Sequence, residues 1–495
     1  MSLKAFLSYP FAKLIVYQNS KWKNNAVSYQ KKTMLKIVDK AKNTLFGVDH
    51  SFSQIKNYSD FKKNIPVRDY EDLKQYVTKI IDGDNDVLWP GKPIYFCKTS
   101  GTTSGEKYIP ISKESMPYHI KSAKDAILSY ISETRNTSII NGKMIFLQGS
   151  PVLSKTGTIL TGRLSGIVAH HIPSYLKKNR LPSFKANSID DWESKVDAIV
   201  EETVAENMSI ISGIPPWVQM YFEKLQNRTG KLIKDIFPKF DLFIYGGVNY
   251  EPYRQTFEKL IGKKVDGIEL YPASEGFIAY QDSQTEKGML LCVNHGIFYE
   301  FIPSEEFFNK NPTRISLADV EIGVNYVIIL NTDAGLWGYN IGDTIKFVSI
   351  DPYRIVVSGR IKHFTSAFGE HVIAEEVEKS LQETITKIPA QVNEFHVAPQ
   401  VKPESGLPYH QWLIEFEKEP ENMADFSELI DNTLQKHNSY YKDLISGGIL
   451  KPLLITKINK NGFRDYMKSI GKLGGQNKVP RLANDRKIAD KLNVF

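Results

Sequence analysis

Hydrophobic and polar residues recur along the chain with two different periods. Apolar residues spaced three or four positions apart predict helix from about residue 5 to residue 47, and again at 112–132, 190–205, 216–225 and 251–261. Short apolar runs typical of buried strands fall between the helices, at 143–147, 208–212, 242–245 and 265–270. Strands that alternate with helices in this way predict mostly parallel sheets flanked by helices.

The pattern changes in the second half of the chain. Strands predominate from residue 288 to residue 348, and beyond residue 358 a helix at 374–382 precedes a strand at 411–416. We therefore expect an α/β protein of two domains. The larger domain, 1–357, combines mostly parallel sheets flanked by helices with a β-rich subdomain, and 358–495 forms a smaller α+β domain.

Composition and charge exclude several classes of protein. The 63 basic and 56 acidic residues are interspersed, and the net charge of +7 suits an anionic substrate better than a dedicated nucleic-acid surface. Cys97 and Cys292 are the two cysteines, too few for a disulfide framework, which fits a reducing compartment. No apolar run has membrane-spanning length and no secretory leader is evident, so we expect a cytoplasmic protein.

The basic N-terminal helix allows two interpretations. It could lie on a membrane surface, or it could be an ordinary helix with a solvated face, and the sequence favours the solvated face. We therefore expect neither a membrane nor a nucleic acid as a partner. The sequence does not indicate an oligomeric state.

The segment 98–107, KTSGTTSGEK, has the composition of a phosphate-binding loop. It combines hydroxyl groups, two glycines that let the backbone approach a ligand closely, and a terminal lysine. Apolar runs at 94–97 and 108–111 predict a strand on each side. The spacing of a Walker A loop is absent, and a plain surface turn is the alternative interpretation.

Three other segments fall where ligands of open α/β sheets bind, after the carboxyl ends of strands. Residues 245–249, YGGVN, offer a flat glycine backbone to a nucleotide base, or else form a tight turn. Residues 271–276, YPASEG, place a hydroxyl beside a carboxylate, as a magnesium–nucleotide site requires, or else form a helix N-cap.

The third segment, 338–343 (GYNIGD), is followed by Ser358-Gly359-Arg360. A carboxylate after a glycine turn can accept both ribose hydroxyls, and a nearby arginine can donate to the ribose or to a phosphate. The alternative is a hairpin turn that carries a solvated aspartate.

Taken together, the order and spacing of these segments resemble the acyl acid–amido synthetases. This is the auxin-responsive Gretchen Hagen three family of the acyl-adenylate-forming superfamily. The resemblance extends over essentially the whole chain, and includes IPVRDYEDL at 65–73 and QNKVPR at 476–481. It implies that a carboxylic acid attacks the α-phosphate of MgATP to give an acyl-adenylate. An amine, usually that of an amino acid, then takes the acyl group and releases AMP.

The resemblance also implies roles for individual residues. The β- and γ-phosphates would be held by Thr99, Ser100, Gly101, Thr102, Thr103, Ser104, Gly105 and Lys107. Gly246, Gly247, Tyr271 and Ala273 would border the adenine, with Ser274 near the α-phosphate and Glu275 serving Mg²⁺. Asp343 and Arg360 would hold the ribose and its surroundings. Lys478 would be the lysine of a mobile C-terminal lid that reaches the α-phosphate and the attacking carboxylate.

The chain departs from the family pattern in several places. The phosphate loop is shorter before Lys107 than the usual plant form, Pro272 stands where small residues are usual, Asn340 replaces an arginine, and Asn477 replaces a tyrosine. None of these changes removes a carboxylate or a lysine that the chemistry needs. Leu164, Ile167 and Trp217 are candidate apolar walls of the acyl pocket, or else simple core residues.

We therefore predict an ATP-dependent ligase that joins a small carboxylic acid to an amine through an acyl-adenylate. ATP and Mg²⁺ are the expected cofactors. One alternative keeps the adenylation and transfers the acyl group to the thiol of coenzyme A. Another is a nucleotide-binding protein without turnover. The sequence names neither the acid, nor the amine, nor the pathway.

Overall fold

The computed structural model describes residues 3–492 with gaps at 101–105, 173–178, 190, 248–249, 362–363, 366–371, 447–448 and 474–477. The chain divides into two compact units. The large unit contains residues up to Val248, then Glu258–Ile341 and Ile345–Val356. The small unit contains Asn249–Phe257, Gly342–Thr344 and the chain from Val357 onward.

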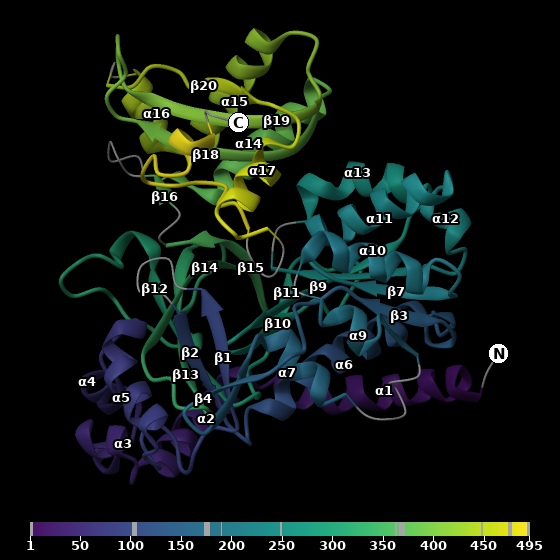
Figure 1. Cartoon of the computed structure of the whole chain (residues 1–495). Coiled ribbons are helices and arrows are strands. Elements are labelled where there is room, and N and C mark those ends of the chain that lie inside the picture. Colours follow the sequence, from purple (N-terminus) through teal and green to yellow (C-terminus); the bar gives the residue numbers. More distant parts are fainter. Residues whose placement is uncertain are drawn as a thin grey trace. The chain divides into compact units, whose positions relative to one another are not determined.

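An eleven-stranded mixed sheet organises the large unit, in the order β12-β13-β14-β15-β11-β10-β9-β8-β7-β3-β6. Its parallel part, β6 to β9, confirms the predicted alternation of strands and helices: β3 Lys143–Phe146, β6 Arg180–Leu181, β7 Met208–Ser212, β8 Leu242–Gly246 and β9 Asp266–Ala273. In Figure 1, α10 and α11 cover one side of these strands and α6 covers the other. Helices therefore cover both faces, which suits the fully buried, apolar strand β7 at the centre of this part.

The β-rich region continues the same sheet. Its strands are β10 Gly276–Tyr280, β11 Met289–Leu291, β12 Ile297–Pro303, β13 Asn325–Thr332, β14 Tyr339–Ile350 and β15 Tyr353–Arg360. Pairing turns antiparallel from β9 to β10 and stays so to β11 and β15. The fold class predicted from sequence is confirmed, with one sheet serving both the parallel and the β-rich regions.

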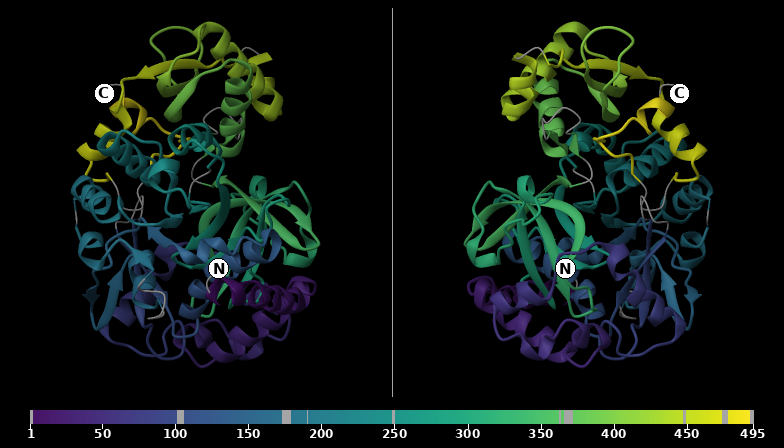
Figure 2. Two further views of the ribbon diagram at one scale, coloured as in Figure 1. Left: turned by 90° about the vertical axis from the view of Figure 1, so that its right-hand side faces the viewer. Right: turned by 90° about the vertical axis from the view of Figure 1, so that its left-hand side faces the viewer.

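The N-terminal helices are α1 Leu3–Lys23, α2 Ala26–Ala41, α3 Leu45–Asp49, α4 Tyr58–Asn64 and α5 Tyr70–Asp82. The first three confirm the helix predicted from residue 5 to residue 47, interrupted at 24–25 and at 42–44. These purple helices lie beside the green β-rich strands in both views of Figure 2. The buried amide of Gln30 fixes the contact, since it donates to the carbonyls of Val293 and Ile297 and accepts from the Tyr299 N–H.

The remaining helices of the large unit include α6 Met116–Thr134, α7 Leu164–His170, α9 Phe184–Asn187, α10 Trp192–Thr203, α11 Pro215–Thr229 and α12 Ile233–Ile236. Helix α13, Glu251–Ile261, carries residues of both units. A second sheet, ordered β2-β1-β5-β4, contains β1 Tyr95–Ser100, β2 Glu106–Ile111, β4 Ser154–Thr156 and β5 Ile159–Gly162. Among the described residues, no helix has the length and apolarity needed to cross a membrane.

The small unit is an α+β fold. Its sheet contains β18 Gln391–Gln400, β19 Tyr409–Lys418 and β20 Leu454–Ile458, with β18–β19 antiparallel and β19–β20 parallel. Helices α14 Ala374–Lys387, α15 Met423–His437, α16 Ser439–Ser446 and α17 Gly462–Ser469 accompany the sheet, with the short elements β16 Phe364–Thr365, β17 Val372–Ile373 and α18 Ala489–Leu492. Phe395, Trp412 and Phe426 are fully buried in its core.

Candidate functional site

The predicted phosphate loop connects two paired strands. Strands β1 and β2 are antiparallel, with Thr99 opposite Lys107 and Ser100 opposite Glu106, so both predicted flanking strands are confirmed. The loop itself, Gly101 to Gly105, lies outside the described residues. Thr99 and Lys107, near the connected ends of the two strands, are half-buried. We call β1, β2 and their connection the phosphate hairpin.

Tyr70 contacts strand β2 of the phosphate hairpin. Its hydroxyl accepts a hydrogen bond from the Tyr108 N–H at 2.9 Å, and the Lys107 ammonium lies 5.6 Å from the centre of its ring. Tyr70 is the first residue of α5, and the local sequence fixes that start. The Asp69 carboxylate accepts from the N–H groups of Glu71 and Asp72, while Asp72 accepts from the Asp69 N–H. This capping box explains why the helix begins beside the hairpin.

Arg68, the residue before this cap, binds the segment 338–340 through its backbone. The Arg68 N–H donates to the Gly338 carbonyl at 2.9 Å, and the Asn340 N–H donates to the Arg68 carbonyl at 2.9 Å. A Cβ on Gly338 would lie 2.2 Å from the Pro66 carbonyl oxygen, so the position requires glycine. The segment 65–73 thus positions both the phosphate hairpin and the start of β14. The roles of Arg68 and Tyr70 were not predicted, although the D-x-x-D spacing at 69–72 signals the helix start.

Two glycines end strand β8, as predicted. Gly246 pairs with Leu270 of β9, and a Cβ on Gly246 would lie 2.3 Å from the Leu270 carbonyl oxygen. Gly247 has a φ of 80°, which favours glycine. The neighbouring Tyr271 is buried in β9. Gly246 and Gly247 thus follow one another at the end of β8, beside Tyr271 and Ala273 of β9.

Ser274 and Glu275 form the two-residue turn between β9 and β10. Ala273 ends β9 and Gly276 begins β10, and these two residues pair across the turn. The alternative interpretation of Ser274 as a helix N-cap is therefore wrong, because strands flank it on both sides. Ser274 and Glu275 are both half-buried.

A thiol connects this turn to the phosphate hairpin. The Cys97 thiol of β1 donates a hydrogen bond to Ser274 Oγ, with a distance of 3.1 Å between the two atoms. Burial raises the pKa of Cys97 to about 12, so it remains a protonated donor. The charges of Glu275 and Arg163 act on the same thiol, Glu275 raising its pKa and Arg163 lowering it. The structure thus brings together the hairpin and the Ser274–Glu275 turn, and Arg163, which the sequence did not single out, lies near enough for its charge to act on the thiol.

In the small unit, Asp343 is paired with Arg360. Arg360 Nε lies 2.8 Å from Asp343 Oδ1, and the Asp343 side chain is 18% exposed. The predicted glycine turn before Asp343 is wrong, because β14 runs from Tyr339 through Gly342 without interruption. Gly342 has a φ of 85° within that strand, a value that explains why a turn was expected. The alternative of a hairpin aspartate exposed to solvent is wrong for the same reason.

Lys478 is an exposed residue of the small unit. Although the residue as a whole is exposed, desolvation of its ammonium lowers the pKa of Lys478 to about 8, with Asp343 raising this pKa and Arg360 lowering it. Gln476 and Asn477 lie outside the described residues.

The three candidate acyl-pocket residues are all buried. Leu164 and Ile167 of α7 belong to the main hydrophobic core. The Trp217 ring packs on Trp192, with 4.5 Å between the ring centres. Their burial is compatible with both interpretations of these three residues, as core residues and as the wall of an apolar pocket.

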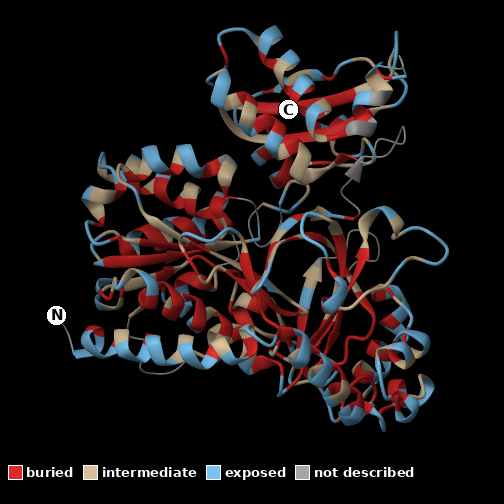
Figure 3. Cartoon of the chain, turned by 180° about the vertical axis from the view of Figure 1, so that it is seen from behind, coloured by how far each residue is buried: buried red, intermediate tan, exposed pale blue. Residues whose placement is uncertain are grey.

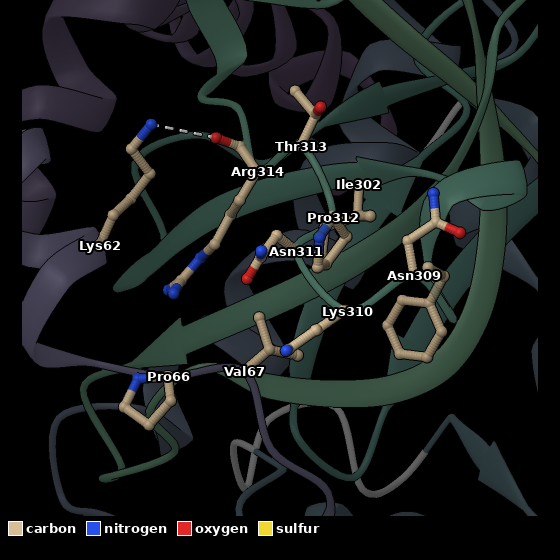
Figure 4. A pocket seen from close by; sticks show the side chains of 11 residues that line it. Lys62, Pro66, Val67, Ile302, Asn309, Lys310, Asn311, Pro312, Thr313 and Arg314 are labelled. Atoms are coloured by element: carbon tan, nitrogen blue, oxygen red, sulfur yellow. Dashed lines mark hydrogen bonds between the residues drawn. The ribbon is translucent and has the colours of Figure 1, made fainter.

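A groove of about 770 Å³ lies elsewhere on the large unit (Figure 4). Lys62, Lys310 and Arg314 supply its positive charge, and the Lys62 ammonium donates to the Arg314 carbonyl at 3.3 Å. Pro66 and Val67 of segment 65–73 also line it, but no residue predicted to contact the nucleotide does.

Models of one protein family match three parts of the chain. The profile of the GH3 family N-terminal domain matches residues 17–183, that of the central domain 290–360, and that of the C-terminal domain 375–487. The jasmonoyl–L-amino acid synthetase JAR4 of Nicotiana attenuata is 24% identical over 65% of this chain and 67% of its own. The indole-3-acetic acid-amido synthetase GH3.3 of Arabidopsis thaliana is 20% identical over 94% of this chain and 90% of its own.

Solved structures agree on the fold. AtGH3.15 acyl acid amido synthetase in complex with 2,4-DB superposes with a TM-score of 0.80, at 17% identity over 98% of this chain and 96% of that one. A 2-hydroxyisobutyryl-CoA ligase superposes more distantly, with a TM-score of 0.54 at 13% identity over 95% of this chain and 89% of that one. The matched family profiles span well over half of the sequence, in their order along the chain. This chain therefore belongs to the GH3 family.

Proposed function

We propose that this chain is an ATP-dependent ligase that adenylates a small carboxylic acid and transfers the acyl group to an amino acid. The observation that carries the proposal is the Cys97–Ser274 contact, which joins the phosphate hairpin to the Ser274–Glu275 turn. This contact supports the proposal because it would hold the groups that we assign to the phosphates close to the carboxylate that we assign to Mg²⁺. The GH3 relatives named above are acyl acid–amido synthetases, which supports the same reaction.

In the large unit, we assign the β- and γ-phosphates to Thr99, Ser100, the loop 101–105 and Lys107. The edge formed by Gly246, Gly247, Tyr271 and Ala273 would receive the adenine, and Ser274 would lie near the α-phosphate. Glu275 would serve Mg²⁺. Among the described residues no cluster of three or more acidic, His or Cys side chains could hold a metal alone. A single carboxylate fits Mg²⁺, because that ion takes most of its other ligands from phosphates and water.

The first step brings like charges together, since a carboxylate oxygen bonds to the α-phosphorus as pyrophosphate leaves. Positive charge must offset this repulsion where it develops. Lys107 would supply it at the phosphates that leave, and Lys478 at the α-phosphate and the attacking carboxylate. Asp343, oriented by Arg360, would accept hydrogen bonds from the ribose hydroxyls. Mg²⁺, when bound, would neutralise phosphate charge.

Arg163 is a further candidate for the acid. Its charge acts on Cys97 beside Ser274 and Glu275, where an incoming carboxylate would approach the α-phosphate. It directly precedes α7, whose Leu164 and Ile167 we assign, with Trp217, to the apolar wall for the acyl chain. In the second step the amine nitrogen bonds to the acyl carbon, the bond to the AMP oxygen breaks, and the nitrogen loses a proton.

We assign ATP and acyl-acid binding to residues 1–357 and a mobile lid that carries Lys478 to residues 358–495. A lid would keep water away from the adenylate, which water hydrolyses. A cytoplasmic location fits the two buried free thiols, Cys97 and Cys292.

ATP–pyrophosphate exchange tests the adenylation. A panel of carboxylic acids should include one that elicits exchange, and Glu275→Ala and Lys478→Ala should each abolish it. Amino acids added with that acid should then release AMP and give an amide. Exchange that survives both substitutions would reject the assigned roles, and ATP binding without AMP release for any acid would favour a protein without turnover.

The coenzyme A alternative rests on the fold shared with the 2-hydroxyisobutyryl-CoA ligase. Offering the preformed adenylate equal amounts of coenzyme A and of amino acids separates the two acceptors. The amide should be the product, and a thioester formed faster than any amide would replace our assignment.

A further inference from the structure

Helix α1 exposes its large apolar side chains and buries its small ones. Its buried residues are Ala5, Ser8, Ala12, Asn19 and Trp22. Six large apolar residues are instead between 46% and 73% exposed: Leu3, Phe6, Leu7, Phe11, Leu14 and Tyr17. We call these six residues the α1 apolar strip. Figure 3 shows exposed residues along the outer side of this helix.

The six side chains form one continuous surface. With about 100° of rotation per residue, they fall within an arc of about 140° on the helix. The strip runs for about 21 Å, given a rise of about 1.5 Å per residue from Leu3 to Tyr17. Scattered single apolar residues need no explanation, but a contiguous apolar surface marks a site of interaction.

Buried polar contacts fix the rotation of α1, so the exposure of the strip follows from the packing of the large unit. Helix α1 packs on α6, and Asn19 Nδ2 donates to the buried Asp125 of α6 at 3.0 Å. Trp22 Nε1 donates to Asn19 Oδ1 at 3.0 Å, and Lys23 pairs with Asp282 at 2.7 Å. A helix rotated to bury the strip would break the Asn19–Asp125 and Lys23–Asp282 contacts, which join α1 to the rest of the large unit.

The charges on α1 indicate what the strip contacts. The helix carries Lys4, Lys13, Lys21 and Lys23 and no carboxylate. On the helical projection Lys4 lies about 20° beyond Phe11 at one margin of the strip, and Lys13 lies about 20° beyond Phe6 at the other. Lysines in these positions can extend their ammonium groups past a buried apolar face toward anionic groups. A second copy of the chain would instead bring like charges together.

An exposed apolar strip with a lysine at each margin can enter the headgroup region of a membrane while its lysines reach lipid phosphates. We propose that the α1 apolar strip docks in the headgroup region of a bilayer that contains anionic phospholipids. The strip enters the interface, and Lys4 and Lys13 contact lipid phosphates. The sequence favoured a solvated face for this helix, but large apolar side chains occupy that face. This association is independent of the proposed ligase activity.

Sedimentation of the full chain with vesicles tests the proposal. The wild type should pellet with vesicles of phosphatidylcholine and phosphatidylglycerol, and added salt should weaken the binding. The variant Phe6→Ser/Phe11→Ser/Leu14→Ser should bind at least about tenfold more weakly, because it removes three apolar insertions. Lys4→Gln/Lys13→Gln should weaken binding to the anionic vesicles only.

Phe308→Ser is the matched control, because Phe308 and Phe6 are both 65% exposed and Phe308 lies outside α1. This variant should bind as the wild type does. The proposal fails if the wild type stays in the supernatant, if the triple variant binds equally well, or if neutral vesicles bind as strongly as anionic ones. Light scattering adds one more outcome: a dimer that the triple variant dissociates, with no vesicle binding, would show that α1 contacts a second copy.

Discussion

Single contacts hold the site residues of the large unit in place. Tyr70 contributes one hydroxyl, which accepts from the partly buried N–H of Tyr108 in β2, and its ring lies beside the Lys107 ammonium. Cys97 contributes one thiol, which reaches Ser274. Neither side chain needs to touch a substrate, and both set the position of residues that we assign to the phosphates.

Replacing Tyr70 with phenylalanine tests this positioning role. The change leaves the Tyr108 N–H without its partner, so we expect a loss of about 1–3 kcal/mol in the free energy of unfolding. Because the hairpin loses a support, KM for ATP should rise in the exchange assay while KM for the acid changes little. Tyr76→Phe is the control. It also removes a hydroxyl from α5, but that hydroxyl donates to Asp49 and not to the hairpin. Equal KM values for ATP in the two variants would contradict the role of Tyr70.

Arg163 permits a second test at this scale. Arg163→Ala should raise KM for the carboxylic acid at least about tenfold, because a carboxylate loses a charge-assisted partner worth about 1.5–3 kcal/mol. Arg163→Lys keeps the charge and should recover part of the loss. An unchanged KM for the acid with a raised KM for ATP would place Arg163 on the nucleotide instead.

At the scale of elements, a capping box fixes the start of helix α5 and with it the position of Tyr70, which contacts the phosphate hairpin. Asp69 and Asp72 start α5 so that Tyr70 faces β2. Asp69→Ala should cost about 1 kcal/mol of stability, as the loss of an N-cap does. It should also raise KM for ATP. Asp191→Ala removes a similar cap, which accepts from the Ser194 N–H of α10, and should cost similar stability without the change in KM.

Equal effects of these two variants on KM would mean that the start of α5 has no special connection to the site. Thermal unfolding and exchange kinetics on the same preparations give both quantities.

Elements with strong periodicity could be predicted from the sequence. The parallel strands β3, β7, β8 and β9 appear as expected because each contains an apolar run, which in β7 is buried throughout. The region 338–343 was expected to turn because it contains two glycines, but pairing within the sheet keeps Gly342 inside β14. Local propensity does not reveal such tertiary pairing.

Composition marks two segments of the candidate site, the predicted phosphate loop and YPASEG; the structure confirms the strands that flank the first and shows a turn within the second. The contributions of Cys97, Tyr70 and Arg163 were not predictable, because each acts through a partner far away in the sequence. Ser274 is 177 positions from Cys97, and Tyr108 is 38 positions from Tyr70. The exposed face of α1 was also missed, since periodicity shows that a helix has an apolar side but not which side packs.

At the scale of the whole molecule, one buried carboxyl should make stability depend on pH. Asp333 is 8% exposed and lines a cavity of about 180 Å³ with Lys36, Lys40, Glu114 and Tyr118. Burial and the nearby Glu114 charge raise the pKa of Asp333 to about 7, and Lys36 and Lys40 lower it in part. The folded state therefore binds a proton more tightly than the unfolded state, and ionising this group destabilises the fold.

The stability that Asp333 contributes is thus present at low pH and lost as pH rises from about 4 through about 7. Over that range the loss amounts to at most about 1.4 kcal/mol per pH unit. Asp333→Asn cannot ionise, so its free energy of unfolding relative to wild type should increase between about pH 5 and about pH 8. Denaturant titrations at the two pH values measure the difference, and a variant that follows the wild type in parallel would contradict the assignment.

The central claim is that the phosphate hairpin and the Ser274–Glu275 turn serve one nucleotide. A double-mutant cycle of Lys107→Ala and Glu275→Gln, scored by kcat/KM for ATP in pyrophosphate exchange, tests it most directly. Two residues that act on one triphosphate should be coupled. When the effects on kcat/KM are expressed as free energies, the double variant should differ from the sum of the two single variants by more than about 0.5 kcal/mol. Strictly multiplicative effects, or exchange unaffected by either substitution, would contradict the account.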